Sequence, residues 1–151
     1  MRRPVIRTKD VEGFSPASAG GAFVSKLLVD RESVGSESFV LNHFSLKPGR
    51  STSPGAHPSP YDEFYYVLRG HGLLHLGDPA ETFPLEPDTV AFIPGGTQHA
   101  LTNTGEEDLE LLTGMPRPLV EGVNTLYDER LRAWGTSFRC LPSDDKSEKS
   151  S

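Results

Sequence analysis

The stretch HPSPYDEFYYVLRG, residues 57–70, sets a lone His in a loop rich in Pro and Ser, six residues before a Glu that opens an aromatic run. The prolines favour an extended loop, so His57 and Ser59 are expected to share one face. Glu63 and Tyr65 share a face of the following strand for the same reason. A His and a carboxylate that converge on one point can bind a metal ion or transfer a proton.

Short runs of β-branched and aromatic residues surround this stretch, and Gly- and Pro-containing turns separate them. Such runs favour strands, and a series of them is typical of an all-β sandwich or barrel. The very short link at Gly70 predicts a β-hairpin between the two strands that flank it. A short helix is expected at 125–133. The expected strands are 22–29, 38–46, 63–68, 72–77, 81–85, 89–94, 99–104 and 108–113.

A second stretch, DTVAFIPGGTQHALTN, residues 88–103, places another His at the start of a strand. His57, Glu63 and His99 can therefore point into one barrel. Two imidazoles and one carboxylate with open positions suit non-haem Fe²⁺, and the same set suits catalytic Zn²⁺. Each of the three also has a plainer interpretation, as an exposed loop residue, a strand-start charge and a turn residue, respectively.

The two stretches resemble the two motifs of a single-domain cupin, over roughly residues 38–113. The first motif, G-x5-H-x-H-x3,4-E-x6-G, has Ser59 where its second His belongs, and its leading Gly is out of place. The second motif, G-x5-P-x-G-x2-H-x3-N, begins at Asp88 instead of Gly. The matching positions are His57, Glu63 and Gly70 in the first motif, and Pro94, Gly96, His99 and Asn103 in the second.

This resemblance implies a small double-stranded β-helix barrel that holds one divalent metal ion. His57, Glu63 and His99 match the family's ligands, whereas Ser59 does not. A neutral hydroxyl is a poor ligand, so its presence either weakens metal binding or leaves a position for water or substrate. Asn103 is expected to be structural.

The resemblance leaves the reaction open, because cupins include dioxygenases, isomerases, epimerases, decarboxylases and cyclases. We expect a metal-dependent enzyme acting on a small organic molecule, with Fe²⁺ favoured and Zn²⁺, Mn²⁺ or Ni²⁺ as alternatives. Glu63 and Tyr65 are the predicted catalytic residues, and His43 and Ser59 are predicted to bind substrate. One alternative is a ligand-binding cupin that has lost its metal. Another is a catalyst that uses Glu63 and a His as acid and base without metal.

Composition limits the partners and the compartment. The formal net charge of −6, without a long basic cluster, argues against nucleic acid. Cys140 is the single Cys, which fits a reducing compartment, and no apolar run predicts a signal peptide or a membrane span. We therefore expect a cytoplasmic protein with no membrane partner.

The chain length suits one domain with flanking segments. We expect a homodimer, because strand 22–29 is available to cover an exposed sheet edge. The C-terminal extension either closes the barrel mouth or enlarges the dimer interface. The expected divisions are an N-terminal arm at 1–20, the barrel at 21–116, the extension at 117–142 and a disordered tail at 143–151.

Overall fold

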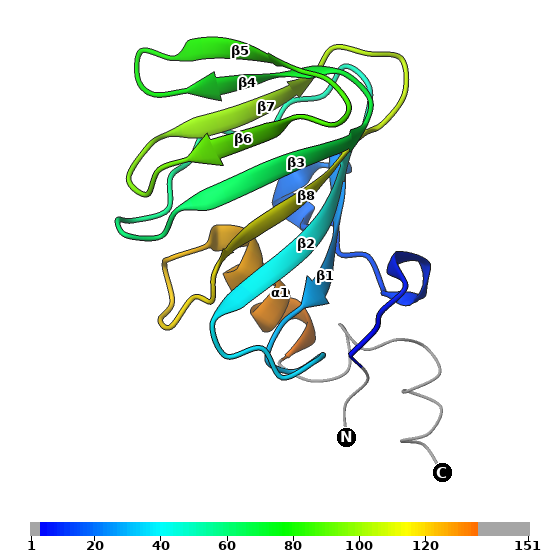
Figure 1. Ribbon diagram of the computed structural model, residues 1–151, viewed down its shortest axis with the longest axis vertical. Helices are drawn as coiled ribbons and strands as arrows, with labels where there is room; N and C mark the ends of the chain where they lie inside the picture. Colours follow the sequence, from blue (N-terminus) through cyan, green and yellow to red (C-terminus); the bar gives the residue numbers. More distant parts are fainter. Residues whose placement is uncertain (1–3, 136–151) are drawn as a thin grey trace.

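The structure is a computed structural model that describes residues 4–135 (Figure 1). Eight antiparallel strands form two sheets, with one helix, α1 (Thr125–Trp134), after them. The smaller sheet has the order β5 (Glu81–Leu85), β4 (Gly72–Leu76) and β7 (His99–Asn103). The larger sheet has the order β1 (Phe23–Val29), β2 (Phe39–Leu46), β8 (Leu109–Pro116), β3 (Glu63–Arg69) and β6 (Val90–Ile93).

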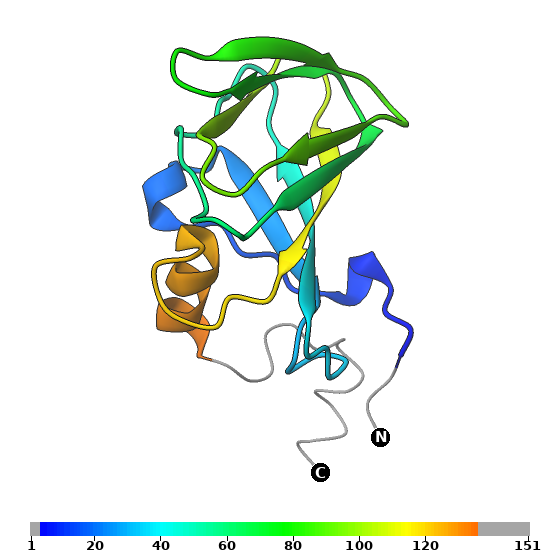
Figure 2. The same cartoon turned by 60° about the vertical axis from the view of Figure 1, so that its left-hand side comes forward.

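The smaller sheet folds over part of the larger one, and the main core lies between them (Figure 2). The inward positions follow the two-residue period of a strand, so alternate residues of β2 and β3 are buried. The predicted all-β barrel is confirmed, and each expected strand range overlaps an observed strand. The most deeply buried members of this core are Leu46, Val67, Ile93, Leu101, Leu109 and Leu111.

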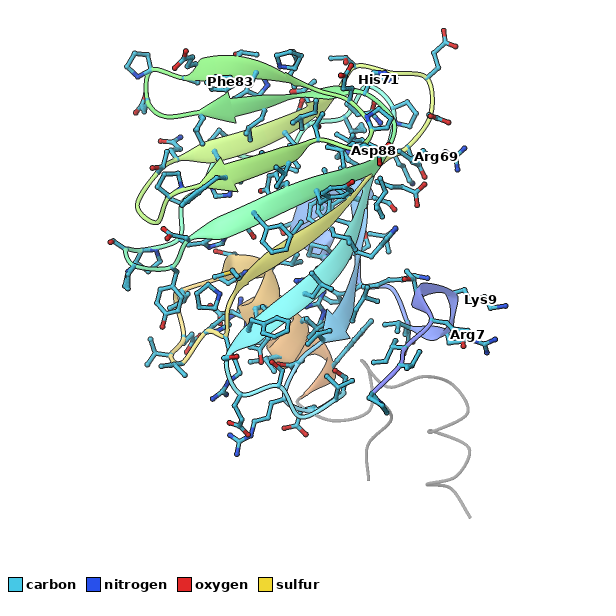
Figure 3. All side chains as sticks on the ribbon, viewed as in Figure 1. Arg7, Lys9, Arg69, His71, Phe83 and Asp88 are labelled. Atoms are coloured by element: carbon cyan, nitrogen blue, oxygen red, sulfur yellow. The ribbon has the colours of Figure 1, made fainter. Side chains whose placement is uncertain are left out.

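The predicted hairpin between β3 and β4 is wrong. β3 pairs with β6 and β8 in the larger sheet, whereas β4 pairs with β5 and β7 in the smaller one. Gly70 lies at the crossing with φ +88°, and a Cβ there would lie 2.5 Å from the Asp108 carbonyl oxygen. Arg69 and His71 flank this crossing (Figure 3). Gly70 therefore lets the chain change sheets where only a glycine fits.

The flanking segments pack on the larger sheet. Phe14 in the arm is buried and forms a β-bridge with Ser25 of β1. The helix expected at 125–133 is confirmed as α1, and its N-cap residue Asn124 accepts a hydrogen bond from the Tyr127 amide at 3.0 Å. No helix within residues 4–135 is both long enough and apolar enough to cross a membrane. Cys140 and the predicted tail at 143–151 lie outside the described residues.

Candidate metal site

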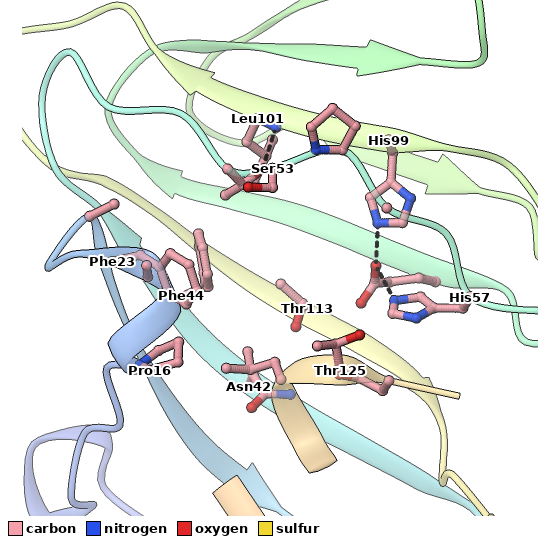
Figure 4. A pocket seen from close by; sticks show the side chains of 18 of the residues that line it. Pro16, Phe23, Asn42, Phe44, Ser53, His57, His99, Leu101, Thr113 and Thr125 are labelled. Carbon is pink, nitrogen blue, oxygen red and sulfur yellow. Dashed lines mark hydrogen bonds and ion pairs between the residues drawn. The ribbon is translucent and has the colours of Figure 1, made fainter. Parts of the chain in front are cut away.

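Three ligand-type side chains converge inside the barrel (Figure 4). His57 comes from the loop between β2 and β3, Glu63 opens β3, and His99 opens β7. The Nε2 atoms of His57 and His99 each lie 3.3 Å from Glu63 Oε1. One ligand atom from each residue lies within 4.8 Å of the others. The structure thus brings together the three residues that the sequence singled out as metal ligands.

Backbone carbonyls hold both imidazole rings. His57 Nδ1 lies 2.9 Å from the Val123 carbonyl oxygen, and His99 Nδ1 lies 3.1 Å from that of Thr97. A carbonyl oxygen only accepts hydrogen bonds, so Nδ1 of each ring carries the proton and donates it. In the neutral imidazole, Nε2 is then left with its lone pair, which is the form that binds a metal ion.

This donor set fits a divalent cation. Two Nε2 lone pairs and a carboxylate oxygen 3.3 Å away repel one another unless a proton or a cation lies between them. Two imidazoles and one carboxylate are ligands of Fe²⁺ and Zn²⁺ sites in proteins. The residues present therefore match the chemistry of the metal that the fold implies.

The electrostatics of the metal-free site follow from its burial and pairing. Burial alone lowers the pKa of His57, but the hydrogen bond and charge of Glu63, with the Val123 carbonyl, raise it overall. Burial alone raises the pKa of Glu63, but hydrogen bonds and charges of the two His lower it overall. Burial, the Glu63 charge and a hydrogen bond to Glu63 raise the pKa of Tyr65 well above its ordinary value. Tyr65 therefore stays protonated at neutral pH.

Backbone pairing explains why His57 meets His99. The Gly55 amide donates to the His99 carbonyl oxygen at 3.1 Å, and the His99 amide donates back at 2.8 Å. The Gly96 amide, at a residue with φ +84°, donates to the His57 carbonyl oxygen at 2.6 Å. These bonds tie the loop before β3 to β7, which places the first-motif His beside the second-motif His.

Two motif positions have structural explanations. Asn103 donates from Nδ2 to the carbonyl oxygens of Leu46 and Glu107, both at 2.8 Å, so its predicted structural role is confirmed. Asp88, where the family's second motif has Gly, adopts φ +64°. Asp tolerates this left-handed conformation better than most residues, which is why it can replace the glycine.

The structure does not bring Ser59 to the predicted site. Residues 59–60 form a turn, and the Tyr61 amide donates to the Pro58 carbonyl oxygen at 2.9 Å. The loop is therefore not extended through this point, and Ser59 is exposed and does not line the cavity. The backbone of Ser59 lies close to Gly95: a Cβ added to Gly95 would be 3.0 Å from Ser59 Cα.

His43 also lies elsewhere than predicted. Its Nε2 is 3.2 Å from Glu110 Oε1, on the face of β2 that points away from the cavity. Its two neighbours in the chain, Asn42 and Phe44, are buried and line the cavity instead. The prediction chose the correct strand and the wrong face, because neighbouring residues in a strand point to opposite sides.

The three ligand-type residues line a cavity of about 480 Å³. Residues outside the predicted barrel form part of its wall. Ser18 of the arm donates from Oγ to Glu129 of α1 at 3.1 Å, and both line the cavity. The sequence showed no motif for these residues. The polar groups in the wall that were not predicted are Ser18, Asn42, Ser51, Thr52, Ser53, Thr113, Asn124, Thr125 and Glu129.

Comparison with known proteins agrees with this architecture. Residues 42–115 match the family described as Cupin domain. The chain is 32% identical to an oxalate-binding protein of Thermotoga maritima over 56% of this chain and 68% of that protein. It is 29% identical to tetracenomycin polyketide synthase protein TcmJ of Streptomyces glaucescens, over 67% of this chain and 68% of that protein.

A solved structure gives the same result. The crystal structure of a predicted oxalate decarboxylase from Thermotoga maritima superposes with a TM-score of 0.65 at 25% identity. The match covers 76% of this chain and 99% of that one. The fold, the two motifs and these relatives agree, and the chain belongs to the cupin family.

Proposed function

We propose that the protein is a metal-dependent enzyme that acts on a small organic molecule in the cavity beside His57, Glu63 and His99. One observation carries this proposal: both Nε2 atoms face the same carboxylate oxygen while both Nδ1 atoms are bonded to backbone carbonyls. The relatives fit it, since one is named as an oxalate-binding protein and another as a polyketide synthase protein.

The three side chains would hold one divalent ion, with Fe²⁺ favoured and Zn²⁺, Mn²⁺ or Ni²⁺ as alternatives. Such an ion supplies Lewis-acid activation of a substrate oxygen and, in the case of iron, chemistry with O₂. Ser59 is exposed and does not line the cavity, so it does not replace the missing His. A three-residue ligand set leaves positions for substrate and water.

Tyr65 and Glu63 have defined roles in this proposal. Tyr65 is 7% exposed and stays protonated beside Glu63, so it can offer its hydroxyl as a hydrogen-bond donor in the site but does not act as a base. The carboxylate of Glu63 faces the two imidazoles, with one oxygen 3.3 Å from each Nε2. Phe23, Phe44 and Leu101 supply apolar parts of the cavity wall.

A second candidate is a cupin that binds a small ligand without turnover. The replacement of the second motif-one His by an exposed Ser favours it, because fewer ligands weaken metal retention. A third candidate, acid–base catalysis by Glu63 with His57 or His99, uses the same residues without a metal.

The test is the metal content of the purified protein, followed by an activity screen with organic acids and phenolic ketones in the presence and absence of chelator. We expect one equivalent of metal and turnover that chelator abolishes. Failure to retain Fe²⁺, Mn²⁺, Ni²⁺ or Zn²⁺ after incubation would contradict the proposal and favour the ligand-binding candidate. Turnover that persists with chelator but is lost in Glu63→Gln would favour acid–base catalysis.

We also propose a homodimer, which is supported by an apolar patch on the outer face of the larger sheet. Phe64 pairs with Phe92 and Tyr66 pairs with Val90 across β3 and β6, so their side chains share that face. All four are exposed, by 37% to 68%. Light scattering should give twice 16.5 kDa for the wild type and a monomer for Phe92→Asp. A wild-type monomer would contradict this proposal. The cytoplasmic location expected from the sequence stays a prediction.

A further inference from the structure

A buried polar cluster adjoins the cavity at Asn42 of β2, one of the lining residues labelled in Figure 4. Asn42 is 9% exposed and lines the same cavity as the metal-ligand residues. The Ser25 hydroxyl donates to Asn42 Oδ1 at 3.1 Å. Arg130 of α1 donates from Nη2 to the same oxygen at 3.4 Å and to Ser25 Oγ at 2.9 Å. Both acceptor positions of Asn42 Oδ1 are therefore occupied.

This cluster fixes the orientation of the Asn42 amide. The Arg130 guanidinium carries only donors, so a flipped amide would set its own NH₂ donor against them. Oδ1 therefore faces Ser25 and Arg130, and Nδ2 points in a different direction from Cγ within the amide plane. Within residues 4–135, Asn42 Nδ2 makes no hydrogen bond to the protein. Asn42, which lines the cavity, thus carries a fixed, nearly buried donor without a partner among the described residues.

The rest of the wall defines what an occupant would look like. Phe23 and Phe44 line the cavity with ring centroids 4.6 Å apart. Among the described lining residues there is no Lys or Arg, whereas Glu63 and Glu129 are acidic. These carboxylates disfavour an anionic ligand that no metal ion holds. The wall therefore suits an uncharged ring system that carries an acceptor oxygen.

We propose that Asn42 is the substrate-orienting residue of the cavity: its Nδ2 donates to a carbonyl or ether oxygen of an uncharged aromatic or alicyclic ligand. Ser25 and Arg130 are positioning residues that hold the amide in the donating orientation. The assignment deepens the proposed function, on which it rests for the choice of this cavity as the substrate site. It explains why a residue of the C-terminal helix reaches a residue of β2 that lies 88 positions away.

The test compares two probes of matched shape, 1-indanone and indane, on ¹⁵N-labelled protein by NMR. Titrations are run on Zn²⁺-loaded and on chelator-treated protein. We expect wild-type protein to bind 1-indanone about tenfold more tightly than indane, the value of one buried hydrogen bond. The Asn42 side-chain NH₂ resonance should move with 1-indanone and stay in place with indane. Asn42→Asp and Asn42→Leu should lose the preference while retaining metal.

Arg130→Met tests the positioning role and should reduce the preference, whereas Arg130→Lys should restore part of it. Equal preference in wild type and Asn42→Leu, or no binding of 1-indanone to the wild type at its solubility limit, would overturn the assignment. Because the preference is also measured in chelator-treated protein, its loss is distinguishable from failure of the proposed function. That failure would appear as a protein that binds no metal yet still prefers 1-indanone through Asn42.

Discussion

Two parts of the cavity wall depend on residues at different distances along the chain. His57, Glu63 and His99 lie within 43 positions of one another and match known motif spacings. In contrast, Asn42 takes its orientation from Ser25 and Arg130, which lie 17 and 88 positions away. Both of these partners are outside the family match at residues 42–115. The comparison indicates that the family-matched segment supplies the three ligand-type residues, whereas β1 and α1, outside that match, orient Asn42.

The largest expected effect comes from substitutions that remove a metal ligand. His57→Ala and His99→Ala should each lower Zn²⁺ affinity by at least about a hundredfold, because losing an imidazole exceeds the effect of disturbing its supporting bonds. A competition titration with a coloured chelator measures this. His43→Ala is the matched control, since His43 pairs with Glu110 on the outer face and should leave the affinity unchanged. Equal losses in all three variants would contradict the assigned site.

The next effect concerns the cluster around Arg130. Arg130→Met should lower the free energy of unfolding by about 2–4 kcal/mol, because it leaves buried acceptors without their charged donor. Urea unfolding measures the loss. Arg132→Ala in the same helix is the control: its side chain is 60% exposed, so the change should stay within about 0.5 kcal/mol. Similar values for the two variants would mean that the cluster does not hold α1 on the sheet.

The affinity for a metal ion should depend on pH, because protons compete with the metal for His57. In the metal-free protein the pKa of His57 is raised, so the stability it contributes is present below its ordinary value of 6.5. That stability is lost as the pH rises through the raised pKa. Metal binding displaces this proton, so affinity should rise about tenfold per pH unit below the raised pKa and then level off. Zn²⁺ titrations at several pH values measure the slope, and a flat profile would contradict the pairing with Glu63.

The smallest effect probes the support of His57 by the C-terminal extension. Val123 is buried against Leu27, Val40 and Met115, and its carbonyl oxygen accepts from His57 Nδ1. Val123→Ala should cost about 1–2 kcal/mol of stability and lower Zn²⁺ affinity by up to about tenfold. Thermal unfolding and metal titration measure the two effects. A loss of stability without any change in Zn²⁺ affinity would mean that the Val123 carbonyl does not support metal binding by His57.

Local patterns predicted much of this molecule. Alternation and turn residues located the strands, and motif spacing located His57, Glu63 and His99. The errors came from features that local sequence does not carry. The two-residue link at 70–71 looks the same in a hairpin and in a crossing between sheets. Choosing Asn42 instead of His43 as the residue that faces the cavity required the register of β2 with β8, where Asn42 opposes the cavity residue Thr113.

The cluster of Ser25, Asn42 and Arg130 had no signal at all. Serine, asparagine and arginine are common in any surface segment, and only the packing of α1 against β1 and β2 makes them a buried unit. Ser59 was misplaced because the turn at 59–60 interrupts the extended loop that alternation assumed. Long-range packing, which no spacing rule records, decided these positions.

The most direct test of the metal site is anomalous diffraction from crystals soaked with Zn²⁺, recorded on both sides of the zinc absorption edge. The account predicts one strong peak bonded to His57 Nε2, His99 Nε2 and a Glu63 carboxylate oxygen, and no peak near Ser59. Crystals of Glu63→Gln treated in the same way should show a much weaker peak. Absence of a peak in the wild type, or a peak held by other residues, would contradict the central claim.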